Sequence, residues 1–195
     1  TLEVFISALN FDDEIKSVGN GIYKTVDGGE TWQHMGLEQS AYFGRIIIDY
    51  SNTNIMYIAT GDRDGWMSWG LGVYKSTDGG YTWTQKTEGM GNKIISKLLM
   101  YPDNHNYLLA AANDGIYFSS NGGENWTKMH STTAAVKDLV FKPGNPQYIY
   151  ATAGGTLYRS TNYGVIWNSL LTTDNHRMVI SVTPANPAKL YIMAT

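Results

Sequence analysis

Cysteine, long apolar runs and basic clusters are all missing from this sequence of 195 residues. Without cysteine there are no disulfides and no thiolate chemistry. No run approaches the roughly 18 to 20 apolar residues that a membrane span requires, so we expect no membrane insertion. Lys and Arg number 14 against 17 Asp and Glu and do not gather, so we expect no nucleic acid partner.

The sequence also lacks the short motifs of metal and cofactor chemistry. None of its histidines, His34, His105, His130 and His176, forms a close pair such as a zinc site uses. No phosphate-binding loop and no nucleophile elbow occurs. The sequence therefore predicts no metal site and no cofactor.

The residues that are present favour a globular, all-β chain. Hydrophobic residues make up 43% of the sequence and charged residues only 16%, a balance that argues against disorder. The 21 glycines, 14 tyrosines and 6 tryptophans are typical of short strands joined by tight turns. We expect little helix.

One stretch of sequence occurs four times. The copies are GIYKTVDGGETW (residues 21–32), GVYKSTDGGYTW (72–83), GIYFSSNGGENW (115–126) and the more divergent TLYRSTNYGVIW (156–167). They recur every ~40 to 50 residues, a period typical of stacked structural repeats. Each copy predicts a β-hairpin, because its Asp or Asn accepts backbone N–H bonds across the turn and its glycines adopt positive φ.

A second repeat precedes each of the last three hairpins and recurs near the end of the chain. Two apolar strands flank a turn whose copies DYSNTN, YPDNHN, KPGNPQ and TPANPA place Asn52, Asn104, Asn145 and Asn186 at one equivalent position. Together with the hairpin this makes a unit of four antiparallel strands in about 40 residues, which matches one blade of a β-propeller.

We therefore predict an all-β fold, a β-propeller of four-stranded antiparallel blades with about four blades and a partial fifth. The expected boundaries are residues 1–36 for an incomplete first blade, 43–90, 91–130 and 131–172 for the next three, and 177–195 for the start of a fifth. The second strand of a blade occurs at both ends, so the two ends do not complement each other in a closed ring. We expect either a fragment of a larger propeller, with the missing blades of the same polypeptide as partners, or an arc that needs partner strands.

The repeated hairpin resembles the Asp-box, or bacterial neuraminidase repeat, S/T-x-D-x-G-x-T-W. Two copies match it fully, through Thr25, Asp27, Gly29, Thr31 and Trp32, and through Ser76, Asp78, Gly80, Thr82 and Trp83. The other two keep Asn121, Gly123 and Trp126, and Asn162, Gly164 and Trp167, with Asn in place of the acid. Asp-box propellers occur in sialidases, xyloglucan-cleaving glycosidases, sortilin-type receptors, a photosystem assembly factor and secreted Bacteroidetes proteins. The resemblance implies a bacterial protein that is secreted or held at the cell surface.

The acids of the Asp-box are predicted to be structural rather than catalytic. Their role in the turn accounts for Asp27, Asp78 and the glycines beside them. In a four-stranded blade this turn also lies on the face opposite the loops that usually bind ligands. The search for a binding site therefore moves to those loops.

Two long loops form the candidate binding site. Blade one inserts residues 10–20 and blade two residues 61–71 between the second and third strands, whereas these connections are minimal in the next two blades. Binding residues concentrate in long loops on a rigid scaffold. Tryptophan rings stack on sugar faces and acids accept hydrogen bonds from hydroxyls. We expect a glycan or protein ligand to contact Asp62, Arg63, Asp64, Trp66, Trp69, Asp12 and Asp13.

Three functions are open at this point. The leading hypothesis is an exported, non-catalytic binding or scaffold module that uses these two loops. The alternative is part of a glycoside hydrolase, in which acids of the two loops form a catalytic pair ~5 to 9 Å apart. Against it, the Phe/Tyr-Arg-Ile-Pro segment of sialidases and the hairpin start of xyloglucanases are missing from the sequence. The third hypothesis is an assembly factor or scaffold without a small ligand.

Overall fold

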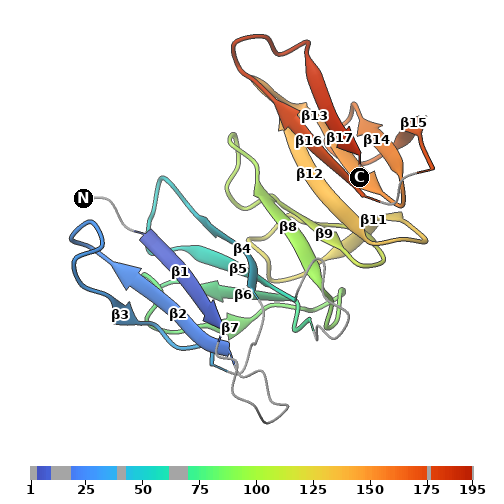
Figure 1. Ribbon diagram of the computed structural model, residues 1–195. Helices are drawn as coiled ribbons and strands as arrows, with labels where there is room; N and C mark the ends of the chain where they lie inside the picture. Colours follow the sequence, from blue (N-terminus) through green and yellow to red (C-terminus); the bar gives the residue numbers. More distant parts are fainter. Residues whose placement is uncertain (1–3, 10–18, 39–42, 62–69, 175–176, 195) are drawn as a thin grey trace.

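The strands of this protein pair in simple sequence order. The computed structural model describes residues 4–9, 19–38, 43–61, 70–174 and 177–194, which form five antiparallel sheets (Figure 1). Within every sheet each strand is hydrogen-bonded to the next one along the chain. This is the meander of a propeller blade, so the predicted fold class is confirmed. The part of the chain that is described contains no helix long and apolar enough to cross a membrane.

We call the five sheets blades one to five. Blade one contains β1 (Val4–Leu9), β2 (Gly19–Thr25) and β3 (Gln33–His34). Blade two contains β4 (Phe43–Ile48), β5 (Met56–Thr60), β6 (Val73–Ser76) and β7 (Thr84–Gln85). Blade three contains β8 (Ile95–Met100), β9 (Leu108–Ala112), β10 (Gly115–Ser119) and β11 (Thr127–Ser131). Blade four contains β12 (Val136–Lys142), β13 (Asn145–Ala153), β14 (Thr156–Ser160) and β15 (Asn168–Thr172), and blade five contains β16 (Met178–Val182) and β17 (Leu190–Ala194).

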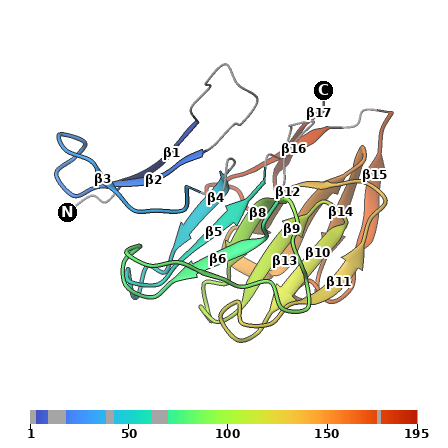
Figure 2. The same ribbon diagram turned by 90° about the horizontal axis from the view of Figure 1, so that it is seen from below.

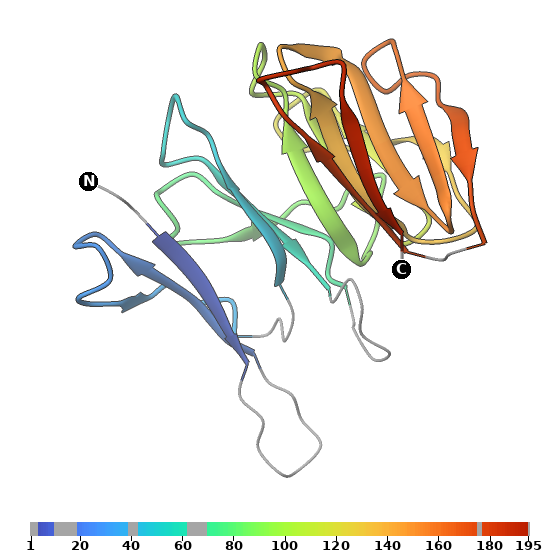
Figure 3. The ribbon, with the colours of Figure 1, turned by 45° about the horizontal axis from the view of Figure 1, so that its top comes forward.

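The blades follow one another in space in the order of the chain. Figure 2 and Figure 3 show this succession from blue to red, with blade one and blade five separated by the other three. From blade two to blade five the first strands of successive blades are neighbours, since β8 contacts both β4 and β12, and β12 contacts β16. Each sheet therefore has a blade on either side of it, except at the two ends of the array.

The hydrophobic core lies between blades rather than inside any one of them. Both β5 and β9 are buried at every position, as expected for strands covered on both faces. Tyr57 of blade two packs with Leu98 and Trp126 of blade three, and on the other face of blade three Leu109 packs with Ile149 of blade four. A blade therefore buries its apolar faces only by stacking on its neighbours, as repeat architectures require.

The four repeated turns, which we label Asp-box turns after the motif that they resemble, form the hydrogen bonds that the sequence predicts. In blade two, Ser76 Oγ donates to Asp78 Oδ1 at 2.8 Å and accepts from the Gly80 N–H at 2.9 Å. Asp78 Oδ1 accepts from the Thr82 N–H at 2.9 Å, and Asp78 Oδ2 accepts from the Thr82 hydroxyl at 2.6 Å. In blade three, Asn121 Oδ1 accepts from the Ser119 hydroxyl and from the Asn125 N–H, both at 3.0 Å, and the bond from a threonine hydroxyl is missing. The acid-containing boxes thus have one side-chain bond more.

The Asn residues of the second repeat are also equivalent in three dimensions. The side-chain oxygens of Asn52, Asn104, Asn145 and Asn186 each accept from the backbone N–H two residues further on, at 3.1 to 3.2 Å. Next to these turns, the backbone N–H groups of Gly79, Gly122 and Tyr163 donate to the carbonyls of Asn54, Asn106 and Gln147. In blades two to four, the Asp-box turn is therefore fastened to the turn between the first two strands of its own blade.

The Asp-box tryptophans behave in two ways. Trp83 and Trp126 donate from Nε1 to the backbone oxygens of Met35 and Lys86, which belong to the preceding blades. Trp32 and Trp167 instead donate to a carbonyl of their own turn. Trp32 is 40% exposed. The Nε1 bonds of Trp83 and Trp126 therefore link successive blades, and those of Trp32 and Trp167 do not.

Candidate functional site

The residues that the sequence predicts as ligand contacts lie outside the described part of the chain. These are Asp12 and Asp13 in one insertion and Asp62, Arg63, Asp64, Trp66 and Trp69 in the other. The structure describes the strands from which both insertions leave. Their placement as a binding site stays a prediction. The ends of these strands show where the insertions leave the sheets.

Both insertions leave the sheets at the same end of the blades. In blade one, Leu9 and Gly19 face each other in the last pair of the ladder, while Thr25 at the other end opens the Asp-box turn. In blade two the equivalent connection joins β5, which ends at Thr60, to β6, which begins at Val73. Blades one and two pack directly on each other, so the two insertions begin on neighbouring blades.

The base of the second insertion is held tightly against blade three. A Cβ added to Gly70 would lie 2.1 Å from the Lys93 carbonyl oxygen, and one added to Gly61 would lie 2.9 Å from Ile94 Cα. The Gly72 N–H donates to the same Lys93 oxygen at 3.0 Å. Glycine is needed at both ends of the insertion because no side chain fits between the backbones. The insertion therefore starts and ends on rigid backbone.

A charged cluster that the sequence analysis did not single out lies at the same end of blade three. Asp114, in the two-residue turn between β9 and β10, pairs with Lys93 at 2.9 Å and with Lys128 at 2.6 Å, and accepts from the Tyr117 hydroxyl. Burial raises the pKa of Asp114, but hydrogen bonds from the two lysines outweigh it and leave the pKa below its usual value. Asp114 is therefore ionised at neutral pH. Lys93 also lies at the insertion base.

His130 is packed against aromatic side chains of the next blade. It lies in β11, with its ring 5.0 Å from that of Tyr158 and 6.1 Å from that of Trp167. Its buried Nε2 atom has no hydrogen-bond partner in the described part of the chain. Burial lowers the pKa of His130, so the ring is neutral at pH 7. It packs between blades three and four.

Ser51, His105 and Asp49 come together but do not form a catalytic triad. Ser51 Oγ lies 2.9 Å from His105 Nδ1, and Asp49 Oδ1 lies 2.7 Å from the same nitrogen. A triad needs the two ring nitrogens to serve different partners. The cluster instead joins the turns between the first two strands of blades two and three. Among the described residues, no three His, Asp or Glu side chains gather as metal ligands.

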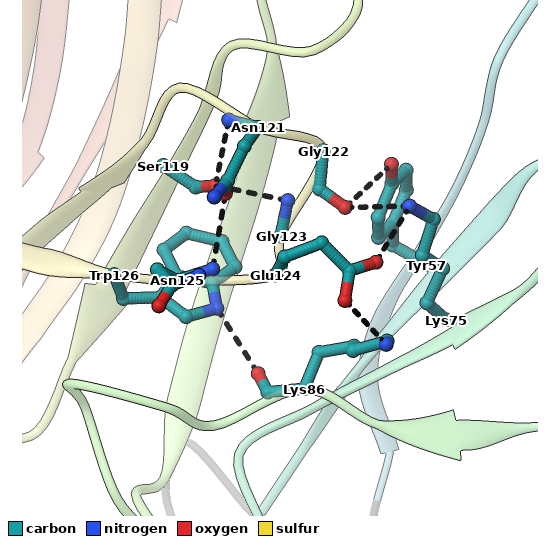
Figure 4. A network of polar contacts seen from close by, with 10 residues as sticks. All are labelled: Tyr57, Lys75, Lys86, Ser119, Asn121, Gly122, Gly123, Glu124, Asn125 and Trp126. Carbon is teal, nitrogen blue, oxygen red and sulfur yellow. Dashed lines mark hydrogen bonds and ion pairs between the residues drawn. The ribbon is translucent and has the colours of Figure 1, made fainter.

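The third Asp-box turn is bonded to blade two by a polar cluster (Figure 4). The Gly122 carbonyl accepts from the Tyr57 hydroxyl at 3.1 Å and from Lys75 at 2.8 Å. Burial raises the pKa of Tyr57 to about 12, so its hydroxyl remains a donor. Glu124 pairs with Lys75 at 3.2 Å and with Lys86 at 2.5 Å, and the bond from Lys86 is the main cause that keeps the pKa of Glu124 low. This Asp-box is a joint between blades.

Comparison with solved structures shows the fold. An ancestral GH74 enzyme matches 76% of this chain at 24% identity with a TM-score of 0.64, over 21% of its own length. The GH74 xyloglucanase of Xanthomonas campestris matches 87% at 15% identity with a TM-score of 0.65, over 28% of its length. YCF48 of Cyanidioschyzon merolae matches 68% at 17% identity with a TM-score of 0.50, over 40% of its length. The chain thus spans less than half of each of these proteins.

Comparison at the level of sequence gives the family. No curated protein sequence matches the chain. The family model Sortilin-Vps10, described as sortilin, neurotensin receptor 3, matches residues 71–176, from the end of the second insertion through blade four. This match covers more than half of the 195 residues and includes three of the four Asp-box hairpins. The chain therefore belongs to the Sortilin-Vps10 family of β-propellers.

Proposed function

We propose that this chain is a non-catalytic, exported binding module that presents residues 10–20 and 61–71 to a polypeptide ligand. The observation that carries the proposal is the position of the two insertions. They leave from the same end of two neighbouring, directly packed blades, while in blades three and four the matching strands are joined by two residues. The connection between the second and third strands is therefore long in the two adjacent blades one and two, and short in blades three and four.

The rigid base of the second insertion supports a binding role. Gly61 and Gly70 pack against the backbone of Lys93 and Ile94 without room for a side chain. Thr60 Oγ1 donates to the Gly72 carbonyl and accepts from the Leu71 N–H, both at 2.8 Å. Loops that are anchored in this way lose less conformational entropy on binding, which favours affinity.

A polypeptide is favoured as the ligand because the family model is described as a neurotensin receptor. A glycan is the second ligand class, since Trp66 and Trp69 supply rings for stacking and Asp62 and Asp64 supply acceptors for hydroxyls. The propeller shared with GH74 enzymes is a likeness of fold at low identity and favours neither ligand. The module acts outside the cell in this proposal, secreted or at the bacterial surface.

A comparison of tryptophan variants tests the site. Binding to an array of peptides and glycans is measured for the wild-type chain, for the Trp66→Ala, Trp69→Ala double variant and for Trp32→Ala as a control. Trp32 lies in an Asp-box turn, at the other end of the blade, so its loss removes an indole without touching the loops. We expect the double variant to lose at least tenfold in affinity and the control to keep it, because buried aromatic anchors dominate such interfaces. Unchanged binding by the double variant would contradict the proposal that residues 61–71 contact the ligand.

The alternative is a part of a glycoside hydrolase with paired carboxylates. Its support is the propeller shared with GH74 enzymes, of which this chain spans 21% to 28%. It predicts that the intact protein hydrolyses a β-glucan such as xyloglucan, and that Asp62→Asn or Asp64→Asn abolishes turnover while sugar binding persists. Absence of hydrolysis in the intact protein removes this alternative and leaves the binding module.

A further inference from the structure

We propose that a pocket between blades three and four, on the Asp-box side, binds the cationic side chain of a lysine or arginine from a protein partner. This site is separate from the two insertions, which leave the opposite end of the blades, and does not depend on their function. The pocket has a volume of about 330 Å³. That is at the lower end of the roughly 300 to 1,000 Å³ of small-ligand sites and suits a single long side chain.

Four aromatic rings form the walls of the pocket. They belong to Tyr101 and Tyr107 beside the turn between β8 and β9, to Phe118 of β10, and to Tyr163 in the fourth Asp-box. Tyr107 lies edge-on to Phe118 at 5.4 Å, and Tyr101 lies 6.2 Å from Tyr163 between ring centroids. Tyr163 is 51% exposed, so this wall borders solvent. The faces of such rings attract cations.

The charge of the pocket is negative. Asp103 is exposed, lines the pocket and forms no ion pair with any described residue. No Lys, Arg or His contributes to the described lining. The remaining lining is Asn104, Met129 and Val165, which are uncharged. A free carboxylate beside several aromatic faces is complementary to a cation on an apolar stem.

The polar groups left in the pocket favour a cation over a sugar. The side-chain oxygen of Asn104 already accepts from the Asn106 N–H at 3.1 Å. The Tyr101 hydroxyl donates to the Tyr163 carbonyl at 2.9 Å, and burial keeps the pKa of Tyr101 well above its usual value. A sugar would need several directed hydrogen bonds for its hydroxyls. A cation instead needs a carboxylate and ring faces, which Asp103 and the four aromatic side chains supply.

Comparison of the repeats shows how the pocket arises. Phe118, Met129 and Val165 occupy the repeat positions that hold Lys75, Lys86 and Glu124 one blade earlier. There the three charged side chains pair with one another and join blades two and three (Figure 4). Without these ion pairs, the equivalent space between blades three and four is hollow and apolar. The pocket therefore lies where the ion pairs of Glu124 fill the junction between blades two and three.

The site is tested by titrating the chain with three probes followed by NMR. The probes are a blocked Gly-Arg-Gly peptide, the same peptide with neutral citrulline in place of arginine, and cellotetraose. We expect the arginine peptide to bind with a Kd of ~1 mM, at least fivefold tighter than the citrulline peptide, and to weaken as salt is raised. Equal binding of the two peptides, or tighter binding of cellotetraose, would overturn the proposal.

Two variants locate the binding. Asp103→Asn removes the charge, and Tyr163→Gly removes one wall while installing the residue that the other three boxes have there, namely Gly28, Gly79 and Gly122. We expect each to weaken the arginine peptide about fivefold. Tyr81→Ala is the matched control, since Tyr81 is an exposed tyrosine of the blade two Asp-box that does not line the pocket. Full affinity in Tyr163→Gly would overturn the proposal.

The two proposals fail separately. In the Trp66→Ala, Trp69→Ala double variant the arginine peptide keeps its affinity, because those residues belong to the insertions and not to the Asp-box side. Loss of arginine binding in that variant would contradict the pocket as its site. Loss of the array ligand alone would concern only the insertions.

Discussion

The junction between blades two and three contains ion pairs, whereas the junction between blades three and four contains an apolar pocket. Between blades two and three, Glu124 pairs with Lys75 and Lys86 across the gap. Between blades three and four, the same repeat positions are apolar and surround a pocket. Both junctions keep a tyrosine hydroxyl that donates to the Asp-box turn of the next blade, Tyr57 in the first and Tyr101 in the second. The two tyrosines come from different strands, β5 and the end of β8, and the carbonyls that accept from them, Gly122 and Tyr163, occupy the same position of the repeat.

Truncating the two tryptophans at these junctions should give the largest difference. Trp126 is 3% exposed and bonded to blade two, whereas Trp167 is half-buried and bonded to its own turn. We expect Trp126→Ala to lower the free energy of unfolding by about 3 to 5 kcal/mol and Trp167→Ala by about half of that. Urea denaturation followed by circular dichroism measures both. Equal losses would show that the two junctions are equally tight.

Exchanging the charge across the junctions should have a smaller effect. Glu124→Val leaves Lys75 and Lys86 without the carboxylate that they share, although Lys75 keeps its bond to the Gly122 carbonyl, so we expect a loss of about 1 to 2 kcal/mol in the free energy of unfolding. The reciprocal change, Val165→Glu, meets Phe118 and Met129 instead of lysines and should leave stability within about 0.5 kcal/mol. A stability gain from Val165→Glu would contradict the view that the second junction lacks cationic partners.

Acid should loosen the Asp-boxes of blades one and two before those of blades three and four. Hydrogen bonds from the side chain and backbone of Thr82 lower the pKa of Asp78 to about 2, and those of Thr31 lower the pKa of Asp27 in the same way. A lowered folded-state pKa contributes stability above the ordinary value near 4, and this contribution is lost as the pH falls towards the lowered value. Asn121 and Asn162 do not titrate. Protection of the Thr82 amide from exchange, relative to the intrinsic rate at each pH, should fall between pH 5 and pH 2 while that of Asn125 does not, and Asp78→Asn should remove the difference.

Replacing Tyr163 with glycine should change stability least. Tyr163 adopts φ of 58°, in the left-handed region where the other boxes use glycine. Glycine relieves this strain, which costs about 1 kcal/mol, but loses the ring contact with Tyr101 and gains entropy in the unfolded chain. We expect these effects to offset each other within about 0.5 kcal/mol in thermal unfolding. A loss above 2 kcal/mol would mean that the ring is part of the core.

The fold could be predicted because its signals are local. The Asp-box and the turn Asn residues bond to groups within a few positions of themselves, so sequence spacing alone shows their partners. The difference between Trp126 and Trp167 could not be predicted, since both close the same motif and differ only in what the preceding blade offers. The group that accepts from Trp126, the Lys86 carbonyl, lies about one repeat earlier in the chain.

The pocket was missed for a related reason, although a signal was present. Each of Phe118, Met129 and Val165 looks ordinary in its own strand or turn. Only alignment of the repeats shows that all three replace charged residues that pair with one another in the preceding junction. The residues of the two insertions were identified by their length and composition, but periodicity says nothing about segments that interrupt the repeat. Their contacts therefore remain a prediction.

The fastening of the two turns within each blade has a consequence for how such a chain can diverge. The N–H groups of Gly79 and Gly122 donate to carbonyls of the neighbouring turn, at 3.0 Å and 2.8 Å, so the alignment of the inner strands is set from one end of the blade. At the other end, blades one and two insert residues 10–20 and 61–71 where blades three and four have two residues, and the strands pair in the same order in all four blades. The connections at this end can therefore differ in length while the sheets keep their pairing.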